Sequence, residues 1–131
     1  MAQALAQEGL YTEDRKQARE GQLYYPGHNG NSWYKKLQDG RHKLPDFKVK
    51  GQPKVIEIYG RYWHSQEFVE ARNGQDYDFN PERMVEEYAK VGVDCKVYWE
   101  SEIRDKSRLA EIVQEIKDWV AEPVKSEPVP A

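Results

Sequence analysis

The chain has little of what stabilises small secreted proteins or anchors a protein in a membrane. It contains one cysteine, Cys95, and three scattered histidines. A single cysteine forms no internal disulfide, and this set of residues cannot supply the ligands of a structural zinc site. No apolar run approaches the roughly 20 residues that cross a bilayer, and the amino terminus lacks the basic and apolar regions of a signal peptide. We therefore expect an intracellular, cytoplasmic protein with Cys95 in its core, no structural zinc and no membrane partner.

Composition favours one soluble globular domain. The 131 residues are 33% charged and 38% hydrophobic, which suits a chain with a single core. The sequence divides into a polar, partly ordered segment at 1–21, the main domain at 22–120, and a disordered proline-rich tail at 121–131. Trp33 and Tyr34, which follow a loop of turn-forming residues, are expected to pack against the sheet.

The net charge of −3 gives no overall attraction to nucleic acid, but the charges are unevenly distributed. Basic residues gather between positions 35 and 54, where only two acidic residues occur. The residues of this basic stretch that we expect to contact phosphates are Lys35, Lys36, Arg41 and Lys43. The alternative is an ordinary solvated hairpin edge that lysines protect from aggregation.

The order of elements predicts an α/β fold. A hairpin is expected over residues 44–59. After it, Asn80-Pro81 marks a helix start, Gly92 ends that helix, and residues 93–99 alternate as a strand. A helix at 106–120 has one apolar face. Because the strand at 93–99 follows the hairpin through a helix, we expect it to pair in parallel with the second hairpin strand. The result is a small mixed β-sheet with flanking helices.

The hairpin brings two carboxylates close together. With Gly51-Gln52 as a two-residue loop, Asp46 faces Glu57. A three-residue loop that includes Pro53 would set Asp46 opposite Ile58 instead. In either register Asp46 lies beside the Glu57-Ile58 peptide, and Mg²⁺ needs only one or two carboxylates with carbonyl and water oxygens.

Several short motifs follow one another between residues 44 and 102. They are an acid after proline, a hydrophobic strand with a glutamate, two aromatics before a histidine, and a glycine followed by Trp-Glu. They read Pro45-Asp46-Phe47, Val55-Ile56-Glu57-Ile58-Tyr59-Gly60, Tyr62-Trp63-His64, Gly92 and Val97-Tyr98-Trp99-Glu100. In this order they resemble the PD-(D/E)XK nuclease superfamily, and within it the very-short-patch-repair-like branch that includes the EDxHD homing endonucleases.

The resemblance implies a restriction-endonuclease-like fold and a metal site. It makes Asp46 the metal-binding aspartate, Ile58 a carbonyl ligand, and Glu57 the second acidic residue. His64 would act as general acid or base, since an imidazole with a pKa of about 6.5 exchanges protons near neutral pH. The bound ion would be Mg²⁺, with Mn²⁺ as a substitute.

The resemblance also implies contacts with DNA. Tyr62 and Trp63 match aromatics that relatives insert into the base stack. Arg61 stands where homing relatives often have aspartate, and we assign it to DNA binding. Tyr59 stands where most of the superfamily has lysine, which this branch does without.

Two acidic positions of the family pattern are ambiguous in this sequence. Asp78 ranks ahead of Glu82 as the last acidic residue of the catalytic set. The early glutamate is not determined among Glu8, Glu13 and Glu20.

We therefore expect a magnesium-dependent endodeoxyribonuclease of the homing type, of phage or mobile-element origin, that hydrolyses double-stranded DNA. One site cuts one strand, so a double-strand break requires a homodimer or two encounters. The alternative is a catalytically inactive nuclease-fold module for DNA binding or assembly, and RNA cleavage is a third reading.

Overall fold

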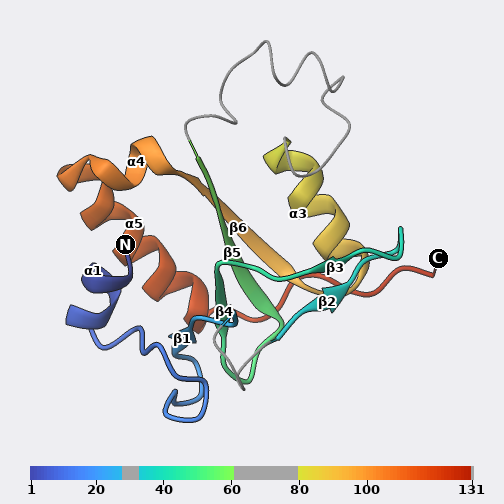
Figure 1. Cartoon of the computed structure of the whole chain (residues 1–131), viewed down its shortest axis with the longest axis horizontal. Coiled ribbons are helices and arrows are strands. Elements are labelled where there is room, and N and C mark those ends of the chain that lie inside the picture. Colours follow the sequence, from blue (N-terminus) through green and yellow to red (C-terminus); the bar gives the residue numbers. More distant parts are fainter. Residues whose placement is uncertain (28–32, 61–79, 131) are drawn as a thin grey trace.

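The computed structural model describes residues 1–27, 33–60 and 80–130 (Figure 1). The elements in chain order are α1 (Ala2–Gln7), β1 (Leu23–Tyr24), β2 (Lys35–Lys36), β3 (His42–Lys43), β4 (Phe47–Val49), β5 (Lys54–Tyr59), α3 (Pro81–Lys90), β6 (Asp94–Trp99), α4 (Glu100–Arg104) and α5 (Lys106–Ala121).

A four-stranded sheet in the order β1-β4-β5-β6 forms the centre of the fold. The β1–β4 and β4–β5 pairs are antiparallel, and β5–β6 is parallel over six residue pairs from Lys54↔Asp94 to Tyr59↔Trp99. Helix α3 lies on one side of the sheet, and α5, α4 and α1 lie on the other (Figure 1). The predicted α/β fold with a small mixed sheet and flanking helices is confirmed.

Side chains of β5 alternate between the two faces of the sheet and contribute to a core on each face. On β5, Val55 and Tyr59 point toward α3, where they pack with Met84 and Tyr88. Ile56 points to the opposite face, into a second cluster built on α5. Because both faces of β5 are covered, its apolar residues serve both cores, and the strand also carries two buried charged residues, Lys54 and Glu57.

Helix α3 begins where the sequence predicts. The Asn80 side chain accepts hydrogen bonds from the backbone N–H groups of Glu82 (3.1 Å) and Arg83 (3.3 Å), and Pro81 occupies the first helical turn. Gly92, with φ of +80°, follows the helix and turns the chain into β6. This capping fixes α3 over the face of the sheet that carries Val55 and Tyr59.

The amino-terminal segment contributes to the core. Leu5 on α1 is fully buried and packs in the cluster built on α5. Tyr11 forms a bridge to Leu23 and an edge-to-face contact with Phe47 at 5.6 Å. The segment at 1–21, which the sequence predicts to be polar and partly ordered, thus adds buried residues to the core. Isolated apolar residues among Ala, Gln and Glu give no periodicity that would reveal this contribution.

The carboxyl-terminal tail, where the sequence predicts disorder over 121–131, contacts the domain through the backbone of residues between 125 and 129. The Asp94 carboxylate accepts hydrogen bonds from the backbone of Lys125 (2.9 Å) and Ser126 (2.8 Å). Further along, the Val129 N–H donates to the Lys90 carbonyl at 2.8 Å. Proline content removes regular structure from this segment but not its docking, which depends on a carboxylate at the start of β6.

A buried lysine joins the sheet to α5. Lys54 is 0% exposed, and its ammonium donates to the carbonyls of Trp119 at 2.7 Å and Glu122 at 2.5 Å. Carbonyls at a helix end lack partners within the helix, and a cation there also opposes the negative end of the helix dipole. Burial lowers the pKa of Lys54, while the nearby Asp94 and Glu122 carboxylates raise it.

We expect Lys54→Met to lower the free energy of unfolding by about 2–4 kcal/mol, because the carbonyls at the end of α5 and the Asp94 carboxylate lose a charged partner. Chemical denaturation monitored by circular dichroism measures this loss. Lys50→Met is the matched control: Lys50 donates to one exposed carbonyl, that of Arg15, so the cost should stay within about 0.5 kcal/mol. Equal losses in the two variants would contradict the assignment.

Candidate active site

The register of the β4–β5 hairpin decides between the two arrangements that the sequence allows. Phe47 pairs with Ile56 and Lys48 with Val55. Continued by one residue, this register sets Asp46 opposite Glu57 and leaves Gly51-Gln52 as the two-residue loop. Gly51 has φ of +81°, a conformation that favours glycine. The two-residue alternative is confirmed, and the one that set Asp46 opposite Ile58 is wrong.

Asp46 closes the end of the hairpin with its side chain. Its Oδ2 accepts a hydrogen bond from the Ile58 N–H at 2.7 Å. The N–H and C=O of one strand residue point to the same side, so the Ile58 carbonyl is directed to the edge of β5 where Asp46 lies. Burial raises the pKa of the Asp46 carboxyl, while the Ile58 hydrogen bond and the Lys43 charge lower it. This corner therefore combines a carboxylate with a backbone carbonyl.

Glu57 is a carboxylate buried in the core. It is 6% exposed and lies between Val55 and Tyr59 on the face of β5 that α3 covers. Burial raises its pKa to about 7; the Lys43 charge acts in the opposite direction, and Asp46 adds to the increase. The Lys43 ammonium lies 3.5 Å from Glu57 Oε2. Glu57 Oε1 is buried and has no hydrogen-bond partner among the described residues.

The groups around Glu57 do little to stabilise its negative charge. The Tyr88 hydroxyl, on α3, is also buried without a partner among the residues described, and its pKa is raised by burial and then by the Glu57 charge. Burial and the Glu57 charge likewise raise the pKa of Cys95 well above its usual value. Cys95 packs in the α3-side core, as predicted. A buried carboxylate with an unpaired oxygen costs free energy that a bound cation would recover.

The donor set fits a hard cation. Asp46, Glu57 and the Ile58 carbonyl are oxygen donors, and one or two carboxylates are enough for Mg²⁺ when waters complete its coordination. Within the ranges that the structure covers, no cluster of three or more His, Cys, Asp and Glu side chains is suited to a metal. The unpaired Glu57 Oε1 is the feature of this pair that points to a ligand.

Part of the predicted site lies outside the described residues. This applies to His64 and Asp78, and to the predicted DNA contacts Arg61, Tyr62 and Trp63. Of the alternatives, Glu82 lies on the first turn of α3, beside an open cleft of about 400 Å³ along β6 that neither Asp46 nor Glu57 lines.

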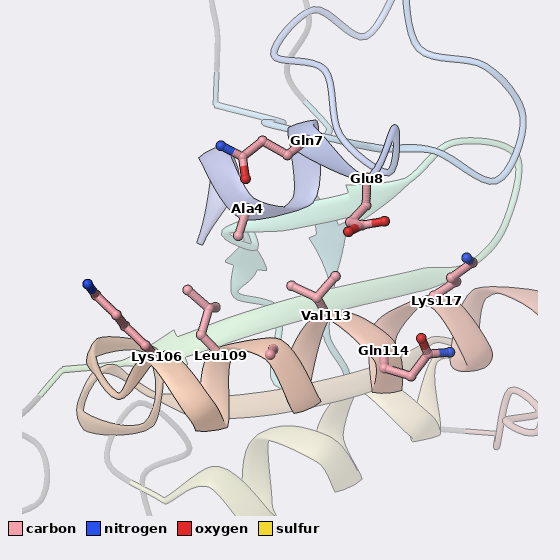
Figure 2. Close-up of a pocket in the computed structure, with 9 residues that line it drawn as sticks. Ala4, Gln7, Glu8, Lys106, Leu109, Val113, Gln114 and Lys117 are labelled. Carbon is pink, nitrogen blue, oxygen red and sulfur yellow. The ribbon is translucent and has the colours of Figure 1, made fainter.

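Two of the three early glutamates lie away from the Asp46–Glu57 pair. Figure 2 shows Glu8 beside a groove of about 290 Å³ between α1 and α5, where Leu109 and Val113 form the α5 side. The Glu20 carboxylate lies against Gly51, at the turn end of the hairpin. Neither is positioned to complete the site.

Six of the seven lysines and arginines between positions 35 and 54 fall into two groups. Lys48 and Lys54 are buried and bond to backbone carbonyls, so they serve the fold. The four residues predicted to contact phosphates lie on or next to a small antiparallel ribbon of β2 and β3, with the pairs Lys35↔Lys43 and Lys36↔His42. Arg41 in the ribbon turn pairs with Asp39 at 2.8 Å. Lys43 has the additional contact with Glu57, which sequence spacing does not indicate.

Trp33 and Tyr34 behave differently from each other. Trp33 packs against the α3-side core, with the Lys48 ammonium 5.0 Å from its ring centre, as predicted for an aromatic packed on the sheet. Tyr34 is 58% exposed, so the same prediction is wrong for this residue. Tyr34 directly precedes β2, and its side chain shares the face of the ribbon that carries exposed Lys36, because side chains alternate along an extended chain.

Protein-family models, curated proteins and solved structures were all compared with this chain, and none of the three gives a match. Of the described residues, none forms a helix long and apolar enough to cross a membrane.

The raised pKa of Glu57 predicts how stability depends on pH. The folded-state value of about 7 exceeds the roughly 4.3 of an unfolded chain, so the folded protein binds more protons between these values and loses stability as pH rises through them. We expect Glu57→Gln to match wild type near pH 4 and to be more stable by about 4 kcal/mol near pH 8, since each unit of pKa difference corresponds to about 1.4 kcal/mol.

Denaturant unfolding at both pH values tests this, with Glu86→Gln on the exposed side of α3 as the control. A Glu57→Gln effect that is the same at both pH values would show that the Glu57 carboxyl is not the titrating group.

Proposed function

We propose that the protein is a magnesium-dependent endonuclease that hydrolyses phosphodiester bonds of duplex DNA. The observation that carries the proposal is the Asp46–Glu57 pair at the open end of the hairpin, with one buried glutamate oxygen lacking a partner among the described residues. A buried carboxylate with a raised pKa and a specific charge partner is typical of functional sites.

The proposed metal ligands come from two sides of β5. Asp46 and the Ile58 carbonyl face the edge of the sheet, and Glu57 approaches from the core side. Magnesium bound there would stabilise charge on the phosphate and position a water molecule. The Lys43 ammonium, next to Glu57, would compensate the negative charge of the two carboxylates and attract the phosphate backbone. His64 is the proposed group that moves the proton.

The motif resemblance supports the finer assignment. In it, the fold is restriction-endonuclease-like, the activity is of the homing type from a phage or mobile element, and the protein is cytoplasmic. Tyr59, at the position where most of the superfamily has lysine, is 3% exposed and packs edge-on against Trp99 at 5.3 Å. A lysine there would point into the core, which agrees with a branch that functions without it. Cutting both strands would require two sites, hence a homodimer or a second encounter.

One contact favours the alternative, an inactive module that binds DNA or assembles with a partner. Lys43 already pairs with Glu57 at 3.5 Å, and an ammonium in that position competes with a metal ion for the carboxylate. In an inactive module this ion pair would be permanent and structural.

We expect purified protein to convert supercoiled plasmid to nicked and linear forms with Mg²⁺ or Mn²⁺ and not with EDTA. Asp46→Asn and His64→Ala should each lower the rate about 100-fold or more, the scale of losing a group that acts in the transition state. Gel electrophoresis over a time course measures the rates. Asp118→Asn, an exposed carboxylate on α5, should cut like wild type.

Folded wild-type protein that binds DNA but leaves it intact with each metal, on plasmid and on phage genomic DNA, would contradict the nuclease and favour the inactive module. Cutting that survives Asp46→Asn would contradict the site.

A further inference from the structure

The β2–β3 ribbon has two different faces. Lys35 and Lys43 form the half-buried inner pair, and Lys43 reaches Glu57 from there. Lys36 and His42 form the exposed outer pair. Because side chains alternate along each strand, Tyr34 shares the outer face with Lys36, and Leu44 shares it with His42.

The outer face presents an aromatic and apolar surface to solvent. Tyr34 is 58% exposed and Leu44 is 46% exposed. The Tyr34 and His42 rings meet edge to face, with centres 5.3 Å apart and planes at 82°. The histidine therefore supports the tyrosine ring from one side while leaving it in solvent. An exposed ring held in place by its neighbour is a preformed surface for a flat, apolar ligand.

Two lysine charges of the ribbon are open to an anionic ligand. Among the residues that the structure describes, Lys35 and Lys36 form no ion pair, while Lys43 pairs with Glu57 and Arg41 with Asp39. Lys36 lies on the outer face, where its exposed ammonium can meet a phosphate. Exposed aromatic rings beside lysines are what single-stranded nucleic acid requires, since bases stack on the rings and phosphates pair with the ammonium groups.

We propose that the outer face of the ribbon, Tyr34, Lys36, His42 and Leu44, binds unpaired bases of DNA. The inference rests on the proposed nuclease function and narrows its substrate to DNA with an unpaired stretch, such as a flap, gap or locally opened duplex. Lys43 at the end of β3 is three residues from Asp46, which is about 10 Å of extended chain. The ribbon and Asp46 are therefore close enough for one bound DNA molecule to reach both.

Fluorescence anisotropy with labelled 20-nucleotide probes tests the proposal, using the full chain in EDTA so that binding is measured without cleavage. The probes are a single DNA strand, the blunt duplex of the same sequence, a single strand in which abasic sites replace most bases, and the matching RNA strand. Tyr34→Ala removes the ring, Tyr34→Phe keeps it, and Tyr25→Ala removes a tyrosine that is 42% exposed outside the ribbon.

We expect wild type to bind the DNA strand more tightly than the duplex or the abasic strand. Tyr34→Ala should weaken binding of the DNA strand about tenfold, the size of losing one stacked base, and leave the abasic strand unchanged. Tyr34→Phe and Tyr25→Ala should bind like wild type. Lys36→Ala should weaken the base-containing and abasic strands equally and flatten the salt dependence.

Equal binding of the intact and abasic strands by wild type, or a Tyr34→Ala variant that binds the DNA strand like wild type, would overturn the proposal. An RNA strand bound about tenfold more tightly than DNA would overturn the assignment to DNA. The outcome is independent of catalysis: selective binding by a protein that cuts nothing would retain the ribbon and reject the nuclease, and cutting without selective binding would do the reverse.

Discussion

The register of the β4–β5 hairpin is the constraint on which the site depends. Gly51, with φ of +81°, allows the two-residue turn that sets Asp46 opposite Glu57 and within hydrogen-bond distance of the Ile58 N–H. A slip of one residue would reverse the faces of β4 and send Lys48 into the α5-side core. A side chain at position 51 would be strained because of this positive φ, even though the neighbouring Glu20 carboxylate can move aside. The turn thus fixes the position of the carboxylates from the far end of the hairpin.

Strand β5 carries two buried charged residues, Lys54 and Glu57, whose surroundings differ. Lys54 donates to carbonyls at the end of α5 and is paired in register with Asp94, so its burial is compensated. Glu57 has one ammonium at 3.5 Å and an oxygen without a partner in the described part of the chain. One buried charge on β5 therefore has its hydrogen-bond partners, while the other lacks a partner for one oxygen within the residues described. Such departures from well-satisfied burial are expected at functional sites. That contrast is the physical reason to look for a cation at Glu57.

The sequence predicted the sheet and its helices because periodicity and capping are local signals. Asn80-Pro81 and Gly92 mark the start and the end of α3, as predicted. For the hairpin, the possible loop lengths left two strand registers. The pairing of Lys43 with Glu57 and the docking of the tail on Asp94 join segments that are distant in sequence, so no spacing rule reveals them. Tyr34 and Trp33 are adjacent aromatics, yet strand alternation separates them into a solvent position and a core position. Which of the two is buried depends on the placement of the ribbon, which composition does not encode.

The most direct test is paramagnetic broadening by Mn²⁺ in a ¹⁵N-labelled sample, because it locates a bound cation without requiring a substrate. At substoichiometric Mn²⁺, the account predicts selective loss of the backbone amide signals of Phe47, Glu57 and Ile58, reversed by excess Mg²⁺ and absent in Asp46→Asn. Broadening centred on the acidic residues of α4 and α5, or unchanged spectra at the hairpin, would contradict the claim that Asp46 and Glu57 form a metal site.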